Sequence, residues 1–133
     1  MAGYSGTPLV TKLGIKDAHT VLLDGLPDGL DLGDLGTPHV VRRLPARQVL
    51  DVSLTFHLER VRFERRLPQL IERTVSNGMI WVCWPKKASK VPTDITEDVV
   101  RDVALADGVV DVKVAAIDEV WSGLKLVRRL ADR

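Results

Sequence analysis

The sequence predicts a single α/β domain, residues 1–133, built on a mostly parallel β-sheet with helices on both faces. Strand-like apolar stretches alternate with helical patterns along the chain, which is typical of this fold class. Residues 79–84 (MIWVCW) are almost all apolar, which indicates a central strand that is covered on both sides. The composition, 45% hydrophobic and 28% charged, is that of an ordinary globular protein.

The N-terminal part of the chain predicts a short helix and a first strand. Residues 1–6 are small and polar, so we expect them to be flexible. Thr7 and Pro8 suit the N-cap and the first position of a helix, and Gly14 suits its end. Residues 20–23 (TVLL) predict the first strand.

Residues 24–36 form a connection rich in glycine and aspartate. The glycines are spaced by four, four and three residues, which is not the G-x-G-x-x-G pattern of a dinucleotide site. The aspartates between them would repel a pyrophosphate, and a calcium loop would need a different pattern of carboxylates. We therefore expect a solvent-exposed loop.

The middle of the chain predicts strands over 39–44, at the sheet edge, and over 48–56. Residues 50–56 alternate apolar and polar side chains, which predicts one thinly covered face. His57 would then be a cap or a surface residue. Residues 59–75 have a helical pattern interrupted by Pro68, which predicts a kink or two helices, 59–67 and 68–75, with a solvated charged face.

The remaining elements follow from caps and apolar runs. Gly78 is available as a left-handed cap after the preceding helix, and Thr93 or Thr96 would cap the next one, which Gly108 ends. Strands are expected over 109–117 and 124–128. The loop between them, 118–123, is short, so these two strands should be antiparallel.

The charge and cysteine content exclude some classes of protein. Nineteen basic and eighteen acidic side chains leave a net charge of +1, so we do not expect nucleic-acid binding. No apolar run is long enough to cross a membrane, and we find no signal peptide. A single cysteine fits a reducing compartment, so we expect a cytoplasmic protein.

Three segments carry one resemblance. Residues 4–9 (YSGTPL), 84–101 (WPKKASKVPTDITEDVVR) and 118–127 (DEVWSGLKLV) resemble a family of short, mostly actinobacterial proteins classed as a domain of unknown function. The similarity extends over nearly the whole chain. It implies no particular activity.

Four segments carry a more distant resemblance, to class I S-adenosylmethionine methyltransferases. It implies a reduced Rossmann-like sheet whose main strands have the order 1-2-3-5-4, with the last strand antiparallel. The glycine motif of that family is replaced here by DGLPDG, and the units carrying its acidic ribose-binding residue are missing or reduced to 39–44. We therefore expect no cofactor bound in the usual way. The segments are 19–29 (HTVLLDGLPDG), 50–56 (LDVSLTF), 77–86 (NGMIWVCWPK) and 109–129 (VVDVKVAAIDEVWSGLKLVRR).

Two loops at one edge of the predicted sheet form the candidate binding site. Loops 84–92 and 118–123 both leave parallel strands at their carboxyl ends, where ligands bind in such sheets. Three interpretations stay open: a purely structural patch with lysine–carboxylate pairs, a surface for an anionic small molecule or an acidic protein partner, and an enzyme. The site residues are Trp84, Lys86, Lys87, Lys90, Asp118, Glu119, Trp121 and Ser122.

The sequence predicts no catalytic or metal-ligating residues. Cys83 lies in a buried strand, where a thiol is normally inert, and a pairing of Cys83 with His57 is the one nucleophile arrangement available. His19, His39 and His57 are each isolated, and no two of them have the helical spacing of metal ligands. We expect a non-catalytic binding or accessory protein. The alternative is a residual small-molecule or S-adenosylmethionine-type cofactor-dependent enzyme, which would need a nucleoside-sized pocket between the carboxyl ends of the first two main strands.

Overall fold

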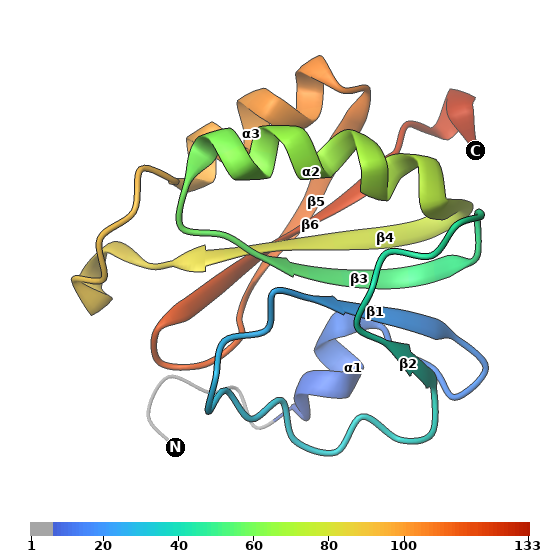
Figure 1. Cartoon of the computed structure of the whole chain (residues 1–133), viewed down its shortest axis with the longest axis horizontal. Coiled ribbons are helices and arrows are strands. Elements are labelled where there is room, and N and C mark those ends of the chain that lie inside the picture. The colour runs from blue at the N-terminus through green and yellow to red at the C-terminus, as the bar shows by residue number, and fades with distance from the viewer. Residues whose placement is uncertain (1–6) are drawn as a thin grey trace.

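The computed structural model describes residues 7–133, and the predicted flexible residues 1–6 lie outside this range. A six-stranded sheet has the order β2-β1-β3-β4-β6-β5 (Figure 1). The first four of these strands are mutually parallel, and β6 is antiparallel to both β4 and β5. The predicted order of the main strands is confirmed, and β2 extends the sheet beyond β1. The strands are β1 (Thr20–Asp24), β2 (His39–Val41), β3 (Leu50–Phe56), β4 (Thr74–Pro85), β5 (Val109–Ala116) and β6 (Trp121–Arg128).

Helices cover both faces of the sheet, as predicted. The helices α2 (Arg60–Arg73) and α3 (Glu97–Ala106) pack on one face, and α1 (Leu9–Leu13) packs on the other (Figure 1). Two 3-10 turns follow at Lys87–Ser89 and Leu130–Asp132. The sheet therefore separates two apolar cores, and a strand residue faces one or the other according to its position in the alternation.

The short helix α1 ends where the sequence predicts. Gly14 adopts the left-handed conformation, with φ at 75°, although the N-cap is Pro8 and not Thr7. The indole Nε1 of Trp81 donates a buried hydrogen bond of 3.0 Å to the carbonyl of Leu13. This bond attaches the end of α1 to the central strand.

The helix α2 is continuous through Pro68, so of the two predicted alternatives the division into helices 59–67 and 68–75 is wrong. It runs from Arg60 to Arg73, because Phe63, Leu67 and Leu70 are all fully buried and hold both halves against the sheet. The strand β4 then starts at once, at Thr74. The predicted left-handed cap at Gly78 is also wrong, since Gly78 lies within β4 and has no positive φ.

The coverage of β3 and the start of β6 also differ from the predictions. The polar face of β3 is not thinly covered: Ser53 and Thr55 have no exposed surface, because α2 packs over them. The strand β6 begins at Trp121 and not at 124, because backbone pairing of Trp121 with Pro85 extends the ladder with β4. Of the two proposed caps, Thr96 is the N-cap of α3. Its Oγ1 accepts a hydrogen bond of 3.2 Å from the backbone N–H of Val99.

Candidate functional site

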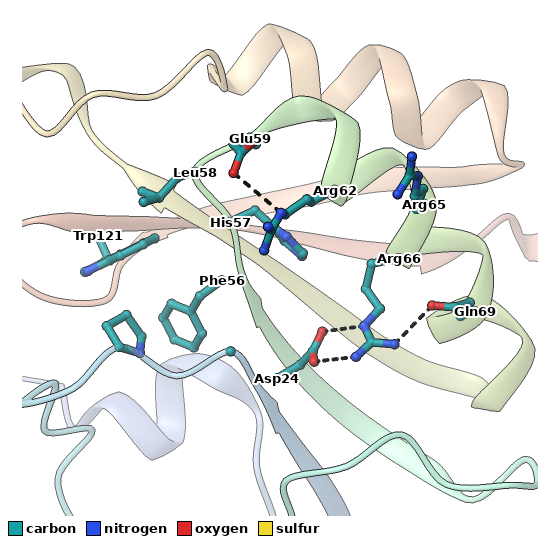
Figure 2. A pocket seen from close by; sticks show the side chains of 12 residues that line it. Asp24, Phe56, His57, Leu58, Glu59, Arg62, Arg65, Arg66, Gln69 and Trp121 are labelled. Atoms are coloured by element: carbon teal, nitrogen blue, oxygen red, sulfur yellow. Dashed lines mark hydrogen bonds and ion pairs between the residues drawn. The ribbon is translucent and has the colours of Figure 1, made fainter.

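A pocket of about 680 Å³ opens at the carboxyl ends of β1 and β3 (Figure 2). The last residue of β1, Asp24, lies beside the end of β3, so these two strand ends form the floor. One face of α2 forms a wall, because residues three, four and seven positions apart in a helix point the same way. The lining residues are Asp24, Gly25, Pro27, Phe56, His57, Leu58, Glu59, Arg62, Arg65, Arg66, Gln69 and Trp121.

An ion pair between α2 and β1 organises the floor. Arg66 donates from Nε and Nη2 to the two carboxylate oxygens of Asp24, at 2.9 Å each. Its remaining guanidinium nitrogen, Nη1, donates to Oε1 of Gln69 at 3.0 Å, as Figure 2 shows. Because only 12% of the Asp24 side chain is exposed, this two-point contact is better shielded from water than a surface salt bridge.

A second set of hydrogen bonds links this ion pair to His57. The hydroxyl of Thr55 donates to Oδ2 of Asp24 at 2.7 Å, and Nε2 of His57 lies 2.6 Å from the same hydroxyl oxygen. Thr55 and His57 are two residues apart and share the α2 side of β3. The four side chains therefore form a continuous chain in the order Arg66, Asp24, Thr55, His57.

The surroundings of His57 favour the neutral form of its imidazole. It is half-buried, and its ring lies 5.7 Å from that of Phe63. Burial lowers the pKa of His57 from its ordinary value of 6.5; Asp24 acts in the opposite direction and the Arg66 charge adds to the lowering. A neutral imidazole in a pocket can accept a proton.

The other side of the pocket combines aromatic rings with exposed charges. Phe56 and Trp121 meet edge to face, with ring centroids 5.3 Å apart. Arg62 lies 3.4 Å from Glu59, and both side chains are largely exposed. Arg65 has no hydrogen bond or ion pair with any residue in the range 7–133. This side of the pocket therefore offers an apolar wall of aromatic rings, the exposed carboxylate of Glu59 and the guanidinium of Arg65, which no residue in the range 7–133 pairs with.

The predicted site residues lie close in the backbone but do not converge. Trp84 pairs with Ser122, and Lys86 N–H donates to the carbonyl of Val120 at 2.8 Å, so the two loops do meet. However, Trp84 packs in the core beneath α2 and α3, while Trp121 packs on the α1 side of the sheet.

The predicted lysine–carboxylate pairs are absent from residues 7–133. No ion pair there involves Lys86, Lys87 or Lys90. Asp118 instead accepts backbone N–H groups of its own turn, and Glu119 is exposed. Only Trp121 of the predicted set lines the pocket. A role of these residues in binding an acidic partner or an anionic small molecule stays a prediction.

The pairing of Cys83 with His57 is wrong. The backbone N–H of His57 donates to the carbonyl of Cys83, but the two side chains lie on opposite faces of the sheet. Burial raises the pKa of the Cys83 thiol far above its usual value, which keeps it protonated and inert. In the described part of the chain, no three His, Cys, Asp or Glu side chains gather as metal ligands.

Sequence reasoning missed most of the pocket because its residues come from four separate elements, β1, β3, α2 and β6, and from the loops beside them. A usable signal did exist: Asp24 and His57 are polar residues that each follow an apolar strand, and such strand ends meet at one edge of a parallel sheet. The contribution of α2 had no signal, because its arginines alternate with glutamates as on a solvated face. None of the helices described in residues 7–133 is long and apolar enough to cross a membrane.

Comparison with known proteins identifies the fold. A methyltransferase from Aquifex aeolicus that depends on S-adenosylmethionine superposes with a TM-score of 0.65 at 15% identity, covering 89% of this chain and 86% of that one. Magnesium protoporphyrin IX methyltransferase from Synechocystis gives 0.64 at 12% identity, over 91% and 80%. A Burkholderia thailandensis N1-methyltransferase of 1,6-didemethyltoxoflavin gives 0.63 at 12%, over 91% and 76%. The chain thus has a methyltransferase-like, Rossmann-like fold.

These structures correct two predictions. The expectation that the chain is not an enzyme is contradicted, because the three solved structures named above, which share its fold, are methyltransferases. The expectation of no cofactor is contradicted as well, because two of them were solved with S-adenosylhomocysteine bound. No protein-family model matches the chain and no curated protein sequence does, so the resemblance to a domain of unknown function is not confirmed.

Proposed function

We propose that this protein is a small-molecule enzyme that uses a cofactor of the S-adenosylmethionine type in the pocket beside β1 and β3. The observation that carries this proposal is the place and size of the pocket. It lies between the carboxyl ends of the first two main strands, where open α/β sheets bind ligands, and its volume of about 680 Å³ suits a nucleoside with a substituent.

The lining residues fit the parts of such a cofactor. The edge of the Phe56–Trp121 pair offers an apolar surface to a flat base. Glu59 can accept hydrogen bonds from ribose hydroxyls, in place of the acidic residue that the short β2 does not supply to the pocket. Arg65 can hold a carboxylate, since no acidic side chain in residues 7–133 pairs with it. When bound, the cofactor would supply an activated methyl group.

The remaining residues shape the pocket. Arg66 and Asp24 neutralise one another, so the floor presents fixed dipoles and little net charge to a ligand. His57, which precedes α2, and Gln69, which lies on α2, add polar groups to the pocket lining. Such an arrangement can orient a small acceptor beside the cofactor, which is the main requirement for group transfer between two bound molecules.

Isothermal titration calorimetry with S-adenosylhomocysteine tests the proposal. We expect measurable binding, weakened about tenfold by Glu59→Gln or Arg65→Gln, which remove one charged hydrogen-bonding group each. The matched control is Arg60→Gln, an arginine on α2 that does not line the pocket, and it should bind as the wild type does. Absence of binding in the folded wild-type protein would contradict the proposal.

A further inference from the structure

The hydrogen bonds around Thr55 determine which nitrogen of His57 carries its proton. A carboxylate held by two guanidinium N–H groups only accepts hydrogen bonds, so the single hydroxyl hydrogen of Thr55 is donated to Asp24. The 2.6 Å contact between Thr55 and His57 therefore needs a hydrogen from the imidazole. That requirement places the proton of the neutral ring on Nε2 and leaves a lone pair on Nδ1.

Nothing in residues 7–133 occupies that lone pair. His57 makes its side-chain hydrogen bond through Nε2 only, and it lines the pocket. The charged groups that share this space are Asp24 from β1, Arg62, Arg65 and Arg66 from α2, and Glu59 before α2. Of these groups, Asp24 is the carboxylate that is hydrogen-bonded to Thr55, and the Thr55 hydroxyl separates it from the imidazole of His57.

We propose that His57 is the general base of this pocket, aligned by Asp24 through the positioning residue Thr55, and that it accepts the proton of a phenolic hydroxyl on the acceptor. This inference rests on the proposed function. The O–H bond of the acceptor breaks, its electron pair stays on oxygen as the nucleophile, and a new N–H bond forms at Nδ1. Asp24 stabilises the resulting imidazolium through Thr55, and the proton then passes to solvent.

The choice of a phenol follows from the strength of the base and the shape of the pocket. A half-buried imidazole is a weak base, so it suits a hydroxyl as acidic as that of a phenol, with a pKa near 10, better than an aliphatic alcohol. Phe56 and Trp121 present flat surfaces on which an aromatic ring can pack. A neutral phenol also needs a base, because its oxygen is a poor nucleophile while it is protonated.

Long-range ¹H–¹⁵N correlation spectra of histidine-labelled protein test both parts of the inference. The chain has three histidines, whose signals are assigned by substituting each one. We expect the Nε2–H tautomer of His57 in the free protein, and a shift of its Nδ1 signal toward the protonated range on addition of 4-nitrophenol. An Nδ1–H tautomer, or an Nδ1 signal that 4-nitrophenol does not move, would overturn the proposal.

Two substitutions of Thr55 distinguish a role of its hydroxyl in positioning His57 from a purely structural role. Thr55→Val keeps the shape of the side chain but removes the hydroxyl, and it should mix the two tautomers of His57. Thr55→Ser restores the hydroxyl and should restore the Nε2–H form. The spectra need no cofactor, so the two proposals can fail separately. Failure of S-adenosylhomocysteine to bind would count against the proposed function alone. An Nδ1–H tautomer of His57 would count against its role as the general base alone.

Discussion

Arg66 and Asp24, 42 residues apart in the chain, meet through two parallel hydrogen bonds of 2.9 Å that join α2 to the end of β1. This ion pair lies under the pocket and also fixes the acceptor of the Thr55 hydroxyl. The packing of α2 on the sheet and the alignment of His57 therefore depend on the same two side chains.

Arg66→Met should destabilise the protein by about 2 kcal/mol, because it leaves the shielded carboxylate of Asp24 without its charged partner. Urea unfolding measures the change. Arg62→Met is the matched control on the same helix, and it should cost less than about 1 kcal/mol because its pair with Glu59 is exposed. Equal losses of stability in Arg66→Met and Arg62→Met would contradict the expectation that the shielded ion pair with Asp24 contributes more than the exposed one with Glu59. Combining Arg66→Met with Asp24→Asn should recover part of the loss.

The pH dependence of stability should report the burial of His57. Its pKa in the folded protein lies below the ordinary 6.5, so just below that pH the unfolded chain binds more protons than the folded one. The contribution of His57 to stability is therefore complete above pH 6.5 and is lost as the pH falls through 6.5 toward the folded-state pKa.

Unfolding free energies measured from about pH 5 to 8 test this expectation. His57→Asn should flatten the decline on the acid side. Leu58→Ala changes the exposed neighbour without adding or removing a titrating group, and it should keep the wild-type slope. A slope that survives in His57→Asn would show that another group causes it.

Ser53→Ala should stabilise the protein by roughly 1 kcal/mol. Ser53 has no exposed surface, and its hydroxyl has no hydrogen-bond partner in the described structure, so folding removes it from water without compensation. Thr55→Val is the comparison, because it removes a buried hydroxyl two residues away that does have partners, and it should be destabilising. Thermal melting distinguishes the two, and a lower Tm for Ser53→Ala would contradict the expectation.

Gly78→Ala should destabilise the protein by about 1–3 kcal/mol through overpacking. A β-carbon at Gly78 would lie 2.9 Å from the carbonyl oxygen of Asp51 and closer still to the Thr74 side chain, so the backbone would have to move. Gly108→Asn is the control, because that position is open and asparagine tolerates its left-handed conformation. Urea unfolding should show a clearly larger loss at Gly78 than at Gly108.

The sequence was sufficient to predict the sheet. Apolar runs such as 79–84 and the alternation of strands with helices determine the fold class, because burial of apolar faces leaves few arrangements open. The resemblance to methyltransferases added the strand order, which the backbone pairing confirms. Local chemistry predicted the end of α1 at Gly14 and narrowed the N-cap of α3 to Thr93 or Thr96, since both features depend only on neighbouring residues.

The pocket could not be predicted from the sequence in the same way. Its floor needs Asp24, Thr55 and Arg66 together, and their contacts arise only once α2 packs across β1 and β3. The predicted convergence of Trp84 and Trp121 fails for a related reason: one residue more or less along a strand places a side chain on the opposite face. Hydrophobic burial determined the sheet from patterns within single segments, whereas long-range packing determined which polar groups meet at its edge.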